Sequence, residues 1–114
     1  MNENTKNVVK MIIYYVIACC EKQDIQQCRD VINLQYDMVS NGGKDEYLDS
    51  MIYVLPERHI VRNLYKEISK NGIEEMISAY KMAVDIFSNA EEINLSKLED
   101  DEEVEKLAEK LMNL

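Results

Sequence analysis

The sequence predicts an all-α protein, a compact single-domain bundle of five or six helices around a central apolar N-terminal helix. At 114 residues the chain is long enough for one domain with a substantial core. It contains three glycines and one proline, so residues that interrupt helices are rare. Apolar residues recur at helical spacing in several segments, and no segment shows a sustained period of two. We therefore expect one helical domain over residues 1–114 and no sheet.

The most apolar stretch is VVKMIIYYVIACC, residues 8–20, in which Lys10 is the one charged residue. On a helix this stretch is apolar nearly all round, which is typical of a helix buried on most sides. We predict a first helix that starts at Thr5 as its N-cap and ends near Lys22, at the centre of the bundle. Its back face carries Tyr14, Tyr15 and Ala18, and these three residues are the predicted interface of a possible homodimer.

The same stretch has to be considered as a membrane or export segment. The apolar run is shorter than the roughly 20 residues that a membrane-spanning helix needs. Residues Val16-Ile17-Ala18-Cys19 resemble the lipobox of bacterial lipoproteins, whose cysteine becomes lipidated. Glu3 and Lys10 do not suit an export signal, which has a positive leader and an uninterrupted apolar core. A core helix of a cytoplasmic protein that does not bind membranes is the favoured interpretation.

The next segments also have helix start and stop signals. Asp24 with Gln27 resembles a capping box and predicts a second helix over about 25–40, closely following the first. Its apolar face leaves Arg29, Asp30, Gln35 and Asp37 on the solvent side. Asn41-Gly42-Gly43 ends this helix, because glycine adopts the left-handed conformation without steric cost. A third, shorter helix is predicted over 44–55, and Pro56 ends it.

Three more helices complete the prediction. The fourth covers about 57–70 and ends at Asn71-Gly72. The fifth, about 73–89, keeps the i, i+3, i+4, i+7 spacing through Ile73, Met76, Ile77, Tyr80, Ala83, Val84 and Phe87. Ser96 with Glu99 forms a capping-box pattern, which predicts that the sixth helix starts there and runs to about Met112.

The formal charge is −9 at pH 7, and the sequence pI is about 4.6. Such a surface repels nucleic-acid phosphates and anionic membranes, so nucleic acid is an unlikely partner. A basic protein partner is favoured instead, since opposite charge speeds the encounter. The predicted partner-binding residues are the clustered acids Asp45, Glu46, Asp49, Glu74, Glu75, Glu99, Asp100, Asp101, Glu102 and Glu103.

No catalytic, cofactor-binding or metal-binding pattern is found. His59 is the one histidine, and no residue at catalytic spacing accompanies it. Cys19, Cys20 and Cys28 are interpreted as small buried free thiols, with a disulfide to Cys28 as the alternative. A zinc site would need a fourth ligand besides the three cysteines, for which His59 is the candidate, and no C-x-x-C pair is present.

Together these features predict a small acidic protein without enzymatic activity, which binds a basic protein through a helical surface as an inhibitor, immunity factor or adaptor does. A homodimer is the first alternative. The second is a nucleic-acid-associated regulator, whose basic surface would combine Lys66, Lys70, Lys81, Arg58 and Arg62. A helix-turn-helix at Asn71-Gly72 is disfavoured because Glu74 and Glu75 would face the DNA.

Overall fold

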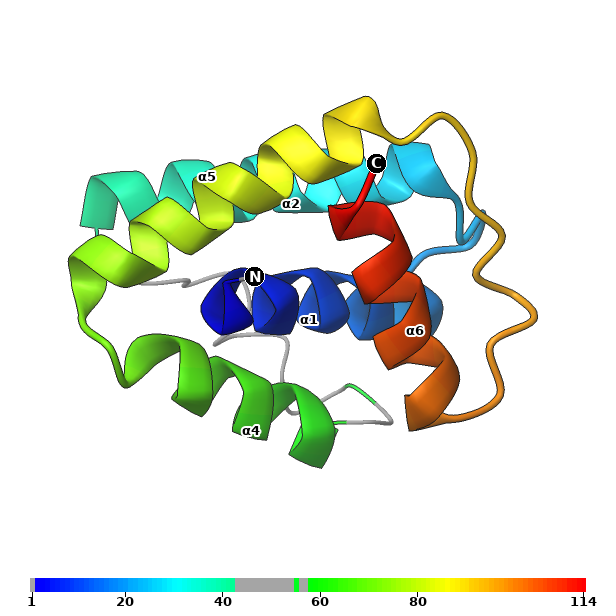
Figure 1. Ribbon diagram of the computed structural model, residues 1–114, viewed down its shortest axis with the longest axis horizontal. Coiled ribbons are helices and arrows are strands. Elements are labelled where there is room, and N and C mark those ends of the chain that lie inside the picture. The colour runs from blue at the N-terminus through cyan, green and yellow to red at the C-terminus, as the bar shows by residue number, and fades with distance from the viewer. Residues whose placement is uncertain (1, 43–54, 56–57) are drawn as a thin grey trace.

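The N-terminal helix lies at the centre of the molecule, and the other described helices pack around it (Figure 1). The computed structural model describes residues 2–42, 55 and 58–114. The helices, labelled as in Figure 1, are α1 (Glu3–Cys19), α2 (Ile25–Gly42), α4 (Arg58–Ser69), α5 (Ile73–Asn89) and α6 (Asp101–Met112). Each of the last four contacts α1. The predicted all-α bundle with a central N-terminal helix is thereby confirmed.

α1 is central because both of its faces are apolar. Its buried apolar side chains are Val8, Val9, Met11, Ile12, Ile13, Tyr14, Tyr15 and Val16. Burying each large aliphatic side chain contributes about 1.5–3 kcal/mol before conformational entropy is counted. No helix in the described part of the chain is long and apolar enough to cross a membrane.

α1 begins one turn earlier than predicted. Asn2, not Thr5, is the N-cap, and its side-chain oxygen accepts from the backbone N–H groups of Asn4 (3.0 Å) and Thr5 (3.2 Å). Asparagine and threonine both cap helices, so an earlier asparagine can extend the helix. Thr5 consequently lies inside the helix and is fully buried.

α2 starts as predicted. Asp24 accepts from the backbone N–H of Gln27 at 3.0 Å. The expectation for Gln35 is wrong, because α2 packs closely against α5 and the Gln35 side chain is completely buried. The predicted third helix, 44–55, lies outside the described residues except for Leu55, which is buried.

α4 leads into α5 through a turn at Gly72. α5 has the predicted bounds, Ile73 to Asn89. Gly72 is its N-cap, with φ 95° and ψ 167°, a combination that is essentially restricted to glycine. α4 ends at Ser69, so the predicted stop at Asn71-Gly72 is confirmed, and Gly72 also starts α5 without a side-chain cap.

The start of α6 differs from the prediction. Ser96 bonds Asn94 instead of capping a helix. The N-cap is Asp100, which accepts from the backbone N–H of Glu103 at 2.9 Å, and the Glu103 carboxylate accepts from Glu99 N–H at 2.6 Å. The connection before it is not helical: it places Ile93 and Leu95 in the core and then turns at residues 96–97.

This connection is also attached to the rest of the bundle. Asn94 forms an isolated antiparallel bridge with Asp24, which precedes α2. Arg29 of α2 donates from Nε to the Phe87 carbonyl at 2.9 Å and from its terminal nitrogens to the carbonyl of Ala90 and the side chain of Gln26. Arg29 was expected on the solvent side but is half-buried, and it holds the C-terminal end of α5.

Candidate functional site

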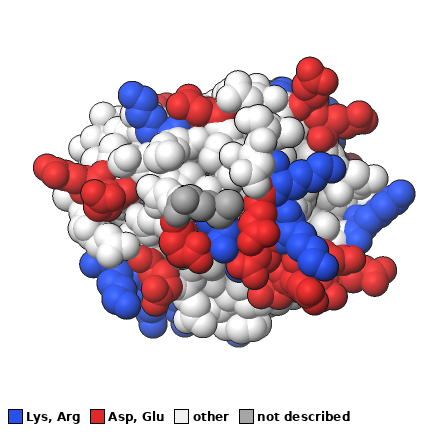
Figure 2. All heavy atoms as spheres, in the orientation of Figure 1, with Lys and Arg blue, Asp and Glu red and all other residues white. Residues whose placement is uncertain are grey.

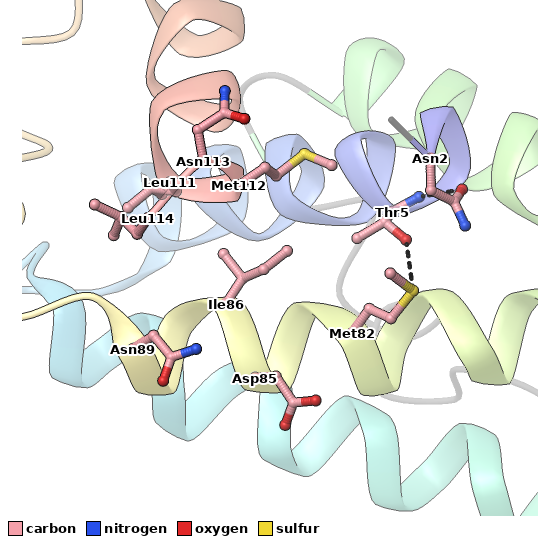
Figure 3. A pocket seen from close by; sticks show the side chains of 10 residues that line it. All are labelled: Asn2, Thr5, Met82, Asp85, Ile86, Asn89, Leu111, Met112, Asn113 and Leu114. Carbon is pink, nitrogen blue, oxygen red and sulfur yellow. Dashed lines mark hydrogen bonds between the residues drawn. The ribbon is translucent and has the colours of Figure 1, made fainter.

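An open apolar groove lies where α5 faces the C-terminal end of α6 and the start of α1 (Figure 3). Its volume is about 610 Å³. We call it the α5–α6 groove, and its lining residues are Asn2, Thr5, Met82, Asp85, Ile86, Asn89, Leu111, Met112, Asn113 and Leu114. Figure 3 shows Met82 and Ile86 pointing from α5 toward the other two helices. Asp85 and Asn89 point away from the gap, so the interior of the groove is mainly hydrocarbon and sulfur.

The groove exists because α5 and α6 both pack on α1 but contact each other little. Met82 and Ile86 are four residues apart and therefore lie on one side of α5. Met82 is 42% exposed, whereas the core residues Ala83 and Phe87 beside this pair are fully buried. Leu114 is the most exposed of the large apolar residues described, at 68%.

A second hollow of about 590 Å³ continues the groove. It shares Asn89, Leu111 and Leu114 with the first, and Glu91, Glu92, Ile93, Asn94, Leu107 and Lys110 complete its lining. Glu91 and Glu92 are exposed at its edge. The upper centre of Figure 2 is mostly uncharged, and both acidic and basic side chains lie to its right.

A buried lysine fixes α6 on α1 and so sets one wall of the groove. Lys6 Nζ lies 3.3 Å from Glu3, 3.1 Å from Glu105 and 3.7 Å from Glu109. The Glu105 hydrogen bond raises the pKa of Lys6 above its usual value, and Lys6 lowers the pKa of Glu105 in return. Sequence analysis missed this cluster because Lys6 and Glu105 are far apart in the chain.

The five consecutive acids at the start of α6 form the acidic segment, residues 99–103, and all five are exposed. Asp100 and Glu103 cap the helix, and Asp101 accepts from the Tyr14 hydroxyl. Glu102 lies 3.5 Å from Lys106 in a surface ion pair. A small hollow of about 270 Å³, which reaches Ile60 of α4, adjoins the segment.

The other predicted acids do not join this segment. Glu74 and Glu75 are exposed in the first turn of α5, at the opposite end of the molecule in Figure 1. Asp45, Glu46 and Asp49 lie outside the described residues. Sequence analysis did not single out Glu91 and Glu92, which lie at the edge of the second hollow.

Two of the three residues of the predicted dimer interface are not on the surface, so this prediction is wrong for them. Tyr14 is 6% exposed and Tyr15 1% exposed, so both rings are buried within one copy of the chain. Ala18 is partly buried and packs against the same core. A second copy therefore has no access to the two tyrosines.

The cysteines differ in burial. Cys28 is buried, as predicted, and burial raises its pKa to about 12. Cys19 is exposed at the end of α1, contrary to the prediction, and Cys20 is half-buried. All three are free thiols. Within the residues that the structure describes, no three side chains of the metal-ligating types converge.

The residues considered for other functions lie mainly on α4. His59 is exposed in its first turn. Arg58, Arg62 and Lys66 follow at i+4 spacing and share one face, and Lys70 follows the helix and lies 4.0 Å from Glu67. Lys81 is exposed on α5. No observation joins these cations to the groove.

Comparison with protein-family models, with curated proteins and with solved structures gives no match. The fold and the groove together define the class of this chain as an all-α bundle with an open apolar groove on its surface. Functional arguments therefore depend on the residues of the chain itself.

Proposed function

We propose that this protein acts by binding a basic protein and not by catalysing a reaction. The observation that carries the proposal is the concentration of exposed carboxylates on the side of the molecule formed by α6 and the connection before it. Seven acids lie there between Glu91 and Glu103 along a short stretch of chain: Glu91, Glu92, Glu99, Asp100, Asp101, Glu102 and Glu103. Lys97 is the one cation in this stretch.

Such a surface supports binding to a positively charged partner in two ways. Opposite charge steers the encounter and raises the association rate. Charge complementarity also selects against acidic partners, because like charges across an interface are costly. The adjacent groove supplies apolar area, which a purely electrostatic surface would lack. An inhibitor, immunity factor or adaptor would use these properties.

The experiment begins with the partner isolated from the native source with the purified protein as bait. The dissociation constant of the purified pair is then measured at about 0.05 M and about 0.3 M salt. We expect the partner to carry net positive charge and the binding to weaken at the higher salt concentration. An acidic partner, or binding that does not change with salt, would contradict the proposal.

Two matched variants locate the charges that matter. Glu99→Gln with Glu102→Gln removes two exposed carboxylates of the acidic segment without touching the N-cap. Glu74→Gln with Glu75→Gln removes the same charge at the far end of α5. We expect the first pair to slow association and weaken binding clearly more than the second. Equal effects would mean that net charge alone, and no particular surface, is responsible.

A further inference from the structure

We propose that the α5–α6 groove binds an amphipathic helix of the partner protein, whose apolar face enters the groove and whose flanks carry lysine or arginine. This inference depends on the proposed function, because it specifies which part of the basic partner binds and where. It adds a docking site distinct from the acidic segment. The two lie at opposite ends of α6, about 18 Å apart along the helix axis.

The shape of the groove fits a helix. Its two hollows adjoin at Asn89, Leu111 and Leu114, and together they follow the edge of α5 and the end of α6. Recognition of a helix in a groove uses apolar anchors at i, i+3 or i+4 and i+7, which need a trough of this kind. Met82 and Leu114 already expose large apolar side chains there. Covering them would remove that apolar surface from water.

The polar groups of the groove argue against a small-molecule ligand. Small-molecule sites have a few polar groups that converge on the ligand. Here Asp85 and Asn89 point away from the gap, and Thr5 directs its hydroxyl to the sulfur of Met82 at 3.5 Å. The polar residues therefore form an edge around an apolar trough, which is the usual arrangement at a protein interface.

The charges at this edge identify the occupant. Asp85, Glu91 and Glu92 are acidic, and Lys110 is the one cation among the lining residues. A helix with basic flanks places positive charge against this edge. A second copy of this chain is the poorer fit, because it too carries a net charge of −9. Like charges across an interface are unfavourable, so we infer a different and basic partner.

The test uses three synthetic peptides of about 18 residues, or five helical turns, as probes. The first has leucine on one helical face and lysine on the other. The second has glutamate in place of lysine, and the third has the composition of the first in an order that scatters the leucines. Binding is measured by titration calorimetry with the full chain. We expect the first peptide to bind, and the other two to bind at least about tenfold more weakly.

Variants then assign the binding to the groove. Met82→Ser with Leu114→Ser removes the two exposed apolar side chains of the groove and should weaken binding at least about tenfold. Leu34→Ser with Ile73→Ser is the control, because both residues are 42% exposed, as Met82 is, but lie outside the groove lining. Thermal unfolding followed by circular dichroism shows that each variant is folded.

A second pair of variants tests the acidic edge. Glu91→Gln with Glu92→Gln should weaken binding of the lysine peptide and reduce its salt dependence. Glu74→Gln with Glu75→Gln removes the same charge far from the groove and should change binding less than about twofold. Because both pairs are exposed, neither replacement disturbs the core.

The outcomes separate this inference from the proposed function. If the native partner binds in a salt-dependent manner but Met82→Ser with Leu114→Ser leaves its affinity unchanged, the groove proposal is wrong and the proposed function stands. If the lysine peptide does not bind, or binds no better than its scattered counterpart, the groove proposal is likewise overturned. Sedimentation experiments test for a dimer. If the chain forms a dimer and Met82→Ser with Leu114→Ser makes it monomeric, the occupant is a second copy and the proposal of a basic helix is refuted.

Discussion

Replacing Arg29 by methionine should destabilise the whole bundle, because this side chain connects α2 to the end of α5. Its guanidinium donates to the carbonyls of Phe87 and Ala90, which lie at the C-terminal end of α5. Helix C-termini carry partial negative charge and carbonyl groups without partners inside the helix. The half-buried Arg29 places a positive charge at this helix end and donates hydrogen bonds to its carbonyl groups.

The magnitude follows from these contacts. A hydrogen bond that involves a charged group contributes about 1.5–3 kcal/mol when buried, and a charge at a helix end adds about 0.3–1 kcal/mol. Solvent reaches Arg29, so we take the lower part of this range, about 2–3 kcal/mol in total. For a chain of this size such a loss lowers the melting temperature by about 8–12 °C. Arg29→Lys keeps the charge but loses the fork geometry, so its loss should be intermediate.

Chemical denaturation, with thermal unfolding as a second measurement, tests this prediction. The control is Lys106→Met on α6, whose ion pair with Glu102 is exposed on both sides and should contribute at most about 1 kcal/mol. If Arg29→Met lost no more stability than this control, water must satisfy the Phe87 and Ala90 carbonyls as well as the guanidinium does, with no loss of unfolding free energy. Arg29 would then not hold the end of α5.

Three further predictions concern the bundle itself. The unfolding free energy should fall as the pH drops below 4.5, the usual pKa of glutamate, because the pKa of Glu105 is lowered in the folded protein. It should also fall as the pH rises above 10.5, because the pKa of Lys6 is raised in the folded protein. When stability is measured over a series of pH values, Glu105→Gln should reduce the loss at acidic pH. Gly72→Ala should cost about 1–3 kcal/mol in denaturation because φ is 95°, whereas Gly42→Ala, whose Cβ meets open space in a helix, should be neutral or stabilising. Gln35→Met should stabilise the protein by about 1–2 kcal/mol in the same assay, since both polar atoms of the Gln35 amide are buried without a hydrogen-bond partner in the described structure. A loss of stability would show that the amide forms a hydrogen bond.

Local sequence signals predicted the helices well and their caps less well. The bounds of α5 and the start of α2 at Asp24 follow from periodicity and from one capping residue. The start of α6 does not, because Ser96 with Glu99 and Asp100 with Glu103 present nearly the same pattern four residues apart. Burial of Ile93 and Leu95 decides between them, because this connection along the edge of the bundle has to place both side chains in the core before α6 begins. That decision is tertiary and is absent from the local pattern.

Charge clusters in the sequence gave no information about their distribution in space. In the sequence, Glu74 and Glu75 form an acidic cluster like the acidic segment, yet this pair and the segment lie at opposite ends of the molecule. The direction in which each helix packs on α1 determines this separation. For the same reason the ion pairs of Lys6 with Glu105 and Glu109 were not foreseen, although they fix α6.

The groove had a signal in the sequence that was not used. The predicted apolar stripe of α5 contains most of its core-facing side chains, although it misses Ala79 and includes the exposed Ile73. It also omits Met82 and Ile86, which form a second apolar line at i+4 spacing. A helix with two apolar lines needs a partner for each one. α1 and α2 cover the first, and α6 approaches the second without covering it, because its position is fixed by Lys6 on α1. Met82 remains 42% exposed and Ile86 is partly buried, and both line the groove. An apolar pair outside the core stripe is therefore the pattern that indicates such a site.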